Sequence, residues 1–353
     1  MVARHVLVTG GAGFIGSCFV RRFLAAEPDA QVTVLDKLTY AGNRANLEEA
    51  TQDPARSSRL RFVEGDIADR PLAREVVKGC DAVVNFAAET HVDRSILDPA
   101  AFLSTNVGGV HSLLEACRAE REHTGKAGPR FVQVSTDEVY GSVTSGESVE
   151  GDALAPRSPY AAAKAAGELL AVSYYVTYGL DVVITRGANT YGPYQHPEKL
   201  IPLFVTNAID DLPLPMYGDG LQRRDWLYVD DHADAIAFVL EHGSAGSTYN
   251  VRGAQETTNR EVVTALLTHL GKPWSLVRTV ADRPGHDRRY SMSGSRLSSL
   301  GFRHSVPFAE GLSHTVRWYV ENEDWWRRVR SGDWNDYYAR QYADRLATST
   351  AAE

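Results

Sequence analysis

Two carboxylates stand side by side directly after a run of apolar residues, in the stretch RFVQVSTDEVYG (residues 130–141). Such an apolar run is typical of a buried parallel strand, and doubly wound sheets bind ligands beyond the carboxyl ends of their strands. Asp137 and Glu138 would then face a ligand, beside the hydroxyl of Thr136. Two carboxyl groups can supply the acid and the base for moving protons. The alternative stays open here: Asp137 could cap a turn and Glu138 could be solvated.

Tyr160 and Lys164 are four residues apart in SPYAAAKA (residues 158–165), and Pro159 favours the start of a helix there. Residues at this spacing lie on one face of a helix and can act together. An ammonium group and an oxidised nicotinamide would both lower the pKa of the tyrosine. The phenolate could then take a proton from a substrate hydroxyl while hydride leaves the carbon. An isolated pair of this kind is more often an exposed tyrosine near a solvated lysine.

Three glycines, Gly10, Gly13 and Gly16, follow the apolar run HVLVT and precede a helical pattern. Glycines at a strand end allow a tight turn and a close approach of the backbone to a pyrophosphate, whose charge the start of a helix stabilises. Asp36 ends the next apolar run, 20 positions after Gly16. A carboxylate there accepts a hydrogen bond from a ribose 2′-hydroxyl and repels a 2′-phosphate. We therefore expect NAD rather than NADP, although the adjacent Lys37 weakens this preference.

The elements that would position these residues alternate along the first half of the chain. Short apolar runs alternate with longer amphipathic segments, at residues 14–26, 101–122 and 159–178, that are expected to be helices. This alternation predicts an α/β fold with a Rossmann-type doubly wound parallel sheet. At residues 191–224 the composition changes, with several Pro and Gly residues that favour turns. A smaller C-terminal α/β lobe that binds the substrate is expected from that point.

The two domains are expected to be interleaved in the sequence. STYNV, at residues 247–251, has the pattern of one more strand that returns to the first domain. We expect the NAD-binding domain to include residues 1–190 and a returning segment near 228–252. The second lobe would take residues 191–227 and 253–353.

Composition argues against several classes of protein. No apolar run among the 353 residues approaches the roughly 18 residues that a membrane span needs. The glycine turn at residue 10 leaves no room for a signal peptide, and Cys18, Cys80 and Cys117 suggest neither a disulfide framework nor a metal site. These features predict a cytoplasmic protein. A net charge of −8 disfavours binding to nucleic acid, and the 11 histidines show no metal-ligand spacing, so no metal is expected.

The Gly-x-x-Gly-x-x-Gly spacing resembles that of the extended short-chain dehydrogenase/reductase superfamily, and Tyr-x-x-x-Lys matches its catalytic pair. The resemblance implies that Thr136 hydrogen-bonds the substrate oxygen, that Asp66 lies by the adenine, and that NFAAE (residues 85–89) passes the cofactor. The expected cofactor contacts are Gly10, Gly13, Phe14, Ile15, Gly16, Asp36, Lys37, Asp66, Ile67, Ala87, Tyr160 and Lys164.

Longer strings resemble one family, the dTDP-glucose 4,6-dehydratases, over nearly the whole chain. Examples are LDKLTYAGN, FAAETHVDRSI, NTYGPYQHPEKLIPL and the closing SGDWNDYYARQY. The resemblance implies oxidation at C4 of the sugar, loss of water across C5 and C6, and return of the hydride to C6, so that tightly bound NAD is regenerated. Thr136, Tyr160 and Lys164 would act at C4. Glu138 would be the base at C5 and Asp137 the acid toward the C6 oxygen.

The same resemblance implies a set of side chains along a nucleotide sugar, the expected substrate. They are Glu89, His91 and Thr136 at the sugar, Asn189, Lys199 and Arg224 at the diphosphate, Glu198 and Tyr217 near the nucleobase, and Asn250, Arg283, His286 and Tyr290 as further contacts. Arginine and lysine bind a diphosphate by charge-assisted hydrogen bonds. The family commonly has Ser-Asn-Asn before Tyr-Gly-Pro, where this chain has Ala188, Asn189 and Thr190. A different nucleotide sugar therefore stays open as the substrate.

Two other classes remain as alternatives. One is an NAD-dependent nucleotide-sugar epimerase or decarboxylase, in which Asp137 and Glu138 are merely polar. The other is a binding protein that senses NAD without turnover. The family also implies a homodimer that pairs the helices expected at residues 101–122 and 159–178.

Overall fold

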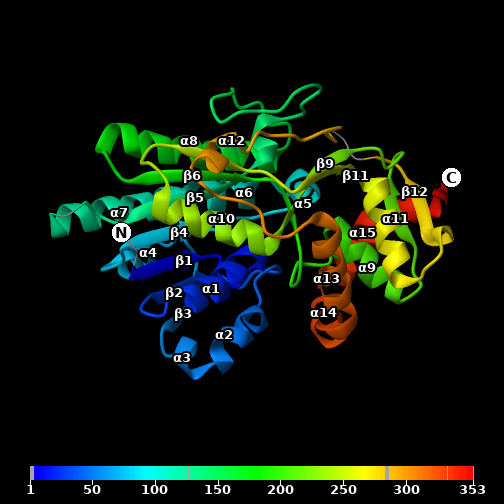
Figure 1. Cartoon of the computed structure of the whole chain (residues 1–353), viewed down its shortest axis with the longest axis horizontal. Coiled ribbons are helices and arrows are strands. Elements are labelled where there is room, and N and C mark those ends of the chain that lie inside the picture. The colour runs from blue at the N-terminus through cyan, green and yellow to red at the C-terminus, as the bar shows by residue number, and fades with distance from the viewer. Residues whose placement is uncertain (1–3, 126, 283–285, 332, 353) are drawn as a thin grey trace.

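The computed structural model describes residues 4–125, 127–282, 286–331 and 333–352. Seven parallel strands form the main sheet, in the order β10-β6-β5-β4-β1-β2-β3 (Figure 1). They are β1 (His5–Thr9), β2 (Gln31–Asp36), β3 (Leu60–Glu64), β4 (Ala82–Asn85), β5 (Arg130–Thr136), β6 (Val182–Gly187) and β10 (Thr248–Val251). The strand order reverses between β1 and β4, which is the place where doubly wound sheets bind ligands. The parallel sheet predicted from the sequence is confirmed.

Side chains of the main sheet alternate between two apolar clusters, one on each face. Val6 and Val8 of β1 pack with helices α1 and α10, whereas Leu7 packs on the other face with α4, α7 and α8. These helices are α1 (Phe14–Ala26), α4 (Arg70–Val77), α7 (Val110–Thr124), α8 (Pro159–Tyr178) and α10 (Val229–His242). Because both faces are covered, the strands are apolar almost throughout.

One expected helix is interrupted. Residues 101–122 are not one helix but the end of α6 (Ala100–Leu103), a π-helical segment (Ser104–Gly109) and most of α7. The side chain of Asn106 explains the interruption, because it accepts from the backbone nitrogen of Glu89 at 2.9 Å and donates to the oxygen of Glu89 at 3.0 Å. Through Asn106, the π-helical segment holds the chain that follows β4 in position. Such segments are frequent near functional sites.

A second group of elements lies beside the main sheet, on the right in Figure 1. It contains two three-stranded sheets, β11-β9-β7 and β13-β12-β8. Their strands are β7 (Asn189–Tyr191), β8 (Leu214–Tyr217), β9 (Arg223–Tyr228), β11 (Gln255–Thr258), β12 (Val277–Val280) and β13 (Thr350–Ala351), and the helices are α9 (Leu200–Ile209), α11 (Asn259–Leu270), α13 (Phe308–Glu321), α14 (Glu323–Val329) and α15 (Asp333–Ala347). A third apolar cluster, rich in Trp and Tyr, joins these helices to the small sheets.

Shorter helices are α2 (Glu48–Gln52), α3 (Pro54–Ser57), α5 (Val92–Leu97) and α12 (Ser295–Ser299). Over the described ranges, no helix is long and apolar enough to cross a membrane. Within the same ranges, no group of three or more His, Cys, Asp or Glu side chains is placed to hold a metal ion.

Candidate active site

The glycine turn brings β1, α1 and the segment after β4 into close contact. Gly10 has φ +67°, and a Cβ atom there would lie 2.6 Å from the backbone nitrogen of Ala87. A Cβ atom on Gly16 would lie 2.3 Å from the oxygen of Gly10. Only glycine fits both positions, because neither backbone neighbour can move aside. The turn forms one end of a cavity that runs along the carboxyl ends of the strands.

All twelve expected cofactor contacts line this first cavity. Asp36 is held at its end of β2, where its carboxylate accepts from the backbone nitrogens of Ala12 at 2.9 Å and Leu38 at 2.8 Å. A carboxylate has about four acceptor positions, so further lone pairs remain for a ribose hydroxyl. Lys37 is ion-paired with Asp66 at 2.7 Å. The glycine cradle and the carboxylate at the next strand end fit a dinucleotide, and we call this cavity the cofactor pocket.

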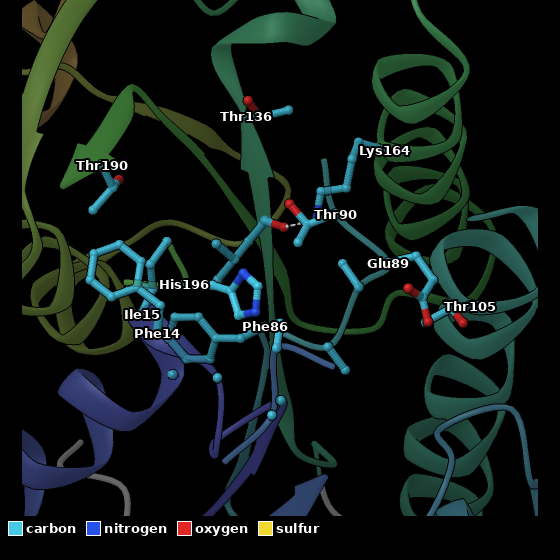
Figure 2. A pocket seen from close by; sticks show the side chains of 18 of the residues that line it. Phe14, Ile15, Phe86, Glu89, Thr90, Thr105, Thr136, Lys164, Thr190 and His196 are labelled. Carbon is cyan, nitrogen blue, oxygen red and sulfur yellow. Dashed lines mark hydrogen bonds between the residues drawn. The ribbon is translucent and has the colours of Figure 1, made fainter. Parts of the chain in front are cut away.

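The expected catalytic residues gather at the end of β5. Thr136 begins a short 3-10 helix (Asp137–Tyr140), accepts from the nitrogen of Glu138 at 3.3 Å and donates to Asp137 Oδ1 at 3.1 Å. The hydroxyls of Thr136 and Thr90 lie close enough to Tyr160 to affect its pKa. Figure 2 shows Thr136 on its strand and Lys164 reaching in from α8. The turn after β5 and the start of α8 thus bring Thr136–Glu138 close to Tyr160 and Lys164.

Burial sets the charges of this group. Burial first, and then the charge of Glu138, raise the pKa of Asp137 to about 8, and its Oδ2 is buried with no hydrogen-bond partner in the described structure. Asp137 is therefore protonated at neutral pH and can donate a proton. Burial also lowers the pKa of Lys164 to about 8, and its Nζ donates to the oxygen of Val134 at 2.6 Å.

Tyr160 behaves differently from what the motif suggests. We expected nearby positive charge to lower its pKa. In the protein alone, burial and then the Glu138 carboxylate raise the pKa of Tyr160, more than the nearby hydroxyls of Thr90 and Thr136 lower it. Deprotonation of Tyr160 therefore depends on positive charge brought in by the cofactor rather than on the protein alone.

A second cavity adjoins the first, and we call it the substrate pocket. Both cavities are lined by Thr90, Glu138, Tyr160, Asn189, Glu198 and Lys199, so they meet at the catalytic group. Among the expected substrate contacts, His91, Asn189, Glu198, Lys199, Tyr217, Arg224 and His286 line the substrate pocket, whereas Glu89 and Thr136 line only the cofactor pocket.

Two of the expected substrate contacts line neither cavity. Asn250 is fully buried, where its side chain accepts from Tyr140 and donates to the oxygens of Ser148 and Ser293. Tyr290 lies under Arg224, whose Cζ is 4.4 Å from the ring centroid. Asn250 is thus buried among protein groups, and the ring of Tyr290 packs against Arg224. Arg283 lies outside the described residues.

Glu198 is held by a cluster that the sequence did not reveal. Its carboxylate accepts from Arg94 at 2.9 Å and from the hydroxyl of Tyr40 at 3.1 Å. The Cζ atom of Arg94 lies 3.7 Å from the ring centroid of Tyr40 and 4.3 Å from that of Tyr337. Burial alone would raise the pKa of Glu198, but electrostatic interactions with basic side chains, His91 and Arg94 among them, outweigh it and lower the pKa to about 2. Glu198 therefore stays ionised.

The C-terminal helix α15 forms another part of the wall of the substrate pocket. Gln341 Nε2 donates to Asp93 Oδ2 at 2.9 Å and to the hydroxyl of Tyr217 at 2.7 Å, and Tyr342 lines the substrate pocket. The only signal for these residues was the closing string SGDWNDYYARQY, to which no role was assigned.

The parallel sheet, the glycine turn and the Tyr160–Lys164 pair together define an NAD-dependent short-chain dehydrogenase/reductase of the extended type. Residues 7–315 match the family model described as GDP-mannose 4,6 dehydratase. A dTDP-glucose 4,6-dehydratase of Streptomyces niveus is 53% identical, over 93% of this chain and 96% of the relative. The chain belongs to the dTDP-glucose 4,6-dehydratase family.

Solved structures agree with this grouping. A dTDP-glucose 4,6-dehydratase from Streptomyces venezuelae, solved with NAD bound, is 55% identical with a TM-score of 0.87, covering 92% of this chain and 99% of that one. A UDP-glucose 4-epimerase from Thermus thermophilus, solved in complex with NAD, is 34% identical with a TM-score of 0.80, covering 90% of this chain and 99% of that one. The chain is thus more similar to the dehydratase than to the epimerase.

Proposed function

We propose that this protein converts dTDP-glucose to dTDP-4-keto-6-deoxyglucose, in deoxysugar biosynthesis, by eliminating water across C5 and C6. The observation that carries the proposal is the pair Asp137 and Glu138: Glu138 lines both cavities, and Asp137, beside it, lines the cofactor pocket. A buried carboxyl whose pKa is raised to about 8 can act as an acid, and Glu138 beside it can act as a base. An epimerase or a decarboxylase does not need both groups.

The reaction begins at C4. Tyr160, which lies near Thr136, takes the proton of the C4 hydroxyl, and Thr136 holds the oxygen in place as it becomes a carbonyl. Bound NAD accepts the hydride from C4 and later returns it to C6. The negative charge that forms on Tyr160 would be stabilised chiefly by the positive charge of the oxidised cofactor, while Lys164 lies one turn further along the same helix.

The elimination follows because a ketone at C4 makes the proton at C5 acidic. Glu138 removes this proton, while Asp137 gives its proton to the C6 oxygen, which leaves as water. The one proton that Asp137 carries is thereby transferred to the hydroxyl that leaves C6. Arg224 and Lys199 in the substrate pocket would bind the diphosphate and so hold the sugar at the junction.

The test is mass spectrometry of dTDP-glucose after incubation with the purified protein in D₂O, without added cofactor. The expected product has lost water and gained one deuterium at C5. A product that keeps its C6 hydroxyl would contradict the proposal and favour an epimerase. Turnover of any kind would exclude a protein that only senses NAD.

The unusual residues before Tyr-Gly-Pro do not favour another substrate. Ala188 and Thr190 line the cofactor pocket and not the substrate pocket. Their side chains are therefore expected to affect binding of the cofactor rather than of the nucleotide sugar. dTDP-glucose remains the substrate that we propose.

A homodimer is part of the proposal. Leu169 and Val176 on α8 are 58% and 74% exposed, and Leu97 and Leu103, on helices that pack against α8, are 65% and 59% exposed. A second copy of the chain would bury this apolar face. Light scattering should report a dimer at micromolar concentration and a monomer for Val176→Asp. A monomeric parent protein would contradict this part of the proposal.

A further inference from the structure

Two residues that line the cofactor pocket each have a buried acceptor atom without a hydrogen-bond partner in the described part of the chain. These atoms are Nε2 of His232, a residue that is 2% exposed, and Oε1 of Gln195, a residue that is 8% exposed. Buried polar atoms are usually paired, so an unpaired one at a cavity wall indicates a ligand atom of complementary type.

Both side chains are fixed by the same residue, Thr190. Gln195 Nε2 donates to the backbone oxygen of Thr190 at 2.8 Å. This hydrogen bond fixes the orientation of the amide, and Oε1 is the atom that stays unpaired. His232 Nδ1 lies 2.8 Å from Thr190 Oγ1, and that hydroxyl donates to the oxygen of Ala188 at 3.0 Å. In Figure 2, Thr190 is seen across the pocket from Lys164.

The hydroxyl of Thr190 determines the tautomer of His232. A hydroxyl has one proton, and it goes to Ala188, so Oγ1 must accept from an N–H at Nδ1. Burial lowers the pKa of His232 to about 3, so the ring is neutral. The opposite tautomer would leave an N–H buried without an acceptor, which is rarer in proteins than an unpaired lone pair. Nε2 therefore presents a lone pair.

The position of His232 corresponds to one end of the dinucleotide. A Cβ atom on Gly187 would lie 2.4 Å from the imidazole Cε1, and Gly187 is the register partner of Thr136 on the adjacent strand. Asp36 ends β2, four strands from β6 in the sheet. Strands lie about 4.8 Å apart, so roughly 19 Å separate the two strand ends. With the adenosine ribose at Asp36, the nicotinamide end lies near Thr136 and Gly187.

We infer that His232 Nε2 and Gln195 Oε1 accept hydrogen bonds from the amide N–H groups of the nicotinamide carboxamide. The carboxamide is the one group at that end of NAD with two donors on one nitrogen. Two acceptors fixed through Thr190 prevent the ring from turning over, and so they select the face that is turned toward the sugar. This inference rests on the proposed function, in that it takes NAD as the cofactor of this pocket.

The experiment compares NAD with 3-acetylpyridine adenine dinucleotide, which has a methyl ketone in place of the amide and so lacks both donors. Purified full-length protein is equilibrated with equal amounts of the two dinucleotides, and the bound ratio is measured by chromatography after removal of free nucleotide. We expect the parent protein to favour NAD by about tenfold or more, because the analogue leaves two buried acceptors unpaired. A ratio near one would overturn the inference, whatever the variants do.

Two substitutions then locate the effect. His232→Phe and Gln195→Met each remove one acceptor at similar volume, and each should move the bound ratio several-fold toward the analogue. His242→Phe is the matched control, because this exposed histidine ends the same helix as His232 and lines neither cavity, and it should keep the parent ratio. Parent-like ratios in both acceptor variants would also overturn the inference. A parent protein that binds neither dinucleotide would instead contradict the proposed function.

Discussion

The two cavities of this site are built in different ways. The walls of the cofactor pocket come largely from strand ends and the turns directly after them, such as the glycine turn after β1 and Asp36 at the end of β2. The substrate pocket joins distant segments instead, as when Gln341 binds Asp93 and Tyr217 across 248 and 124 positions. Short motifs can define the first cavity, whereas only tertiary packing assembles the second.

The largest test of this contrast is at the junction of the cavities. Tyr160→Phe should lower turnover by about 10²–10⁴-fold, because it removes the group that takes the proton at C4. Bound NAD, measured by absorbance and chromatography, should be unchanged. Tyr178→Phe is the control, since this exposed tyrosine ends the same helix away from both cavities. Full turnover by the Tyr160 variant would show that the chemistry is elsewhere.

Asp137→Asn should separate activity from stability. Turnover should fall by about 10²-fold, because the acid for the C6 oxygen is lost. The pKa of Asp137 is about 8 when folded and near 3.8 when unfolded, so the native state holds a proton that the unfolded state releases between these pH values. The stability that this group contributes is therefore present below about pH 4 and is lost as the pH rises toward 8.

Melting temperatures from pH 5 to 8 would measure this effect. The parent protein should lose stability over that range more steeply than Asp137→Asn, and its turnover should fall above about pH 8 as the acid loses its proton. Parallel melting profiles would show that Asp137 is already ionised in the native state.

Gly16→Ala tests the cofactor end by a purely steric change. The added Cβ would meet the oxygen of Gly10 at 2.3 Å, so the turn must open. We expect binding of NAD to weaken by about tenfold or more, which corresponds to roughly 1.4 kcal/mol. Gly151→Ala is the control, because a Cβ atom at that glycine would meet nothing within 4 Å beyond its chain neighbours. Equal retention of NAD by both variants would contradict a tight turn.

The smallest expected effect is at the far wall of the substrate pocket. Gln341→Met removes the two hydrogen bonds that hold Tyr217 and Asp93, so we expect KM for dTDP-glucose to rise several-fold while kcat changes less. Arg340→Met, on the exposed side of the same helix, should leave both constants near the parent values. A fall in kcat alone would indicate that α15 acts on the catalytic group instead.

The same contrast explains what the sequence could predict. Six apolar runs predicted strands of the main sheet, and the glycine turn predicted which end of the sheet binds a ligand, because both signals lie within a few neighbouring residues. The π-helical segment could not be predicted in this way. It depends on a side chain, Asn106, that pairs with the backbone of Glu89 from another element.

The site shows the same limit. Arg94 is an ordinary charged residue in the sequence, and its place between two aromatic rings depends on Tyr40 and Tyr337, which are almost 300 positions apart. Asn250 was expected near the substrate by resemblance alone, whereas the structure buries it among Tyr140, Ser148 and Ser293, outside the lining of both cavities. Neither arrangement has a local pattern from which it could be read.

The late return of the chain to the main sheet has a consequence for synthesis. β10 pairs with β6 only after β7, β8 and β9 have been made, and α10 covers α1 just before it. At about 5–20 residues per second, several seconds pass between the emergence of Gly187 and that of Val251 from the ribosome. During this time the edge of β6 and the apolar side of α1 are uncovered. A chain truncated in this interval should aggregate rather than fold as a smaller NAD-binding protein.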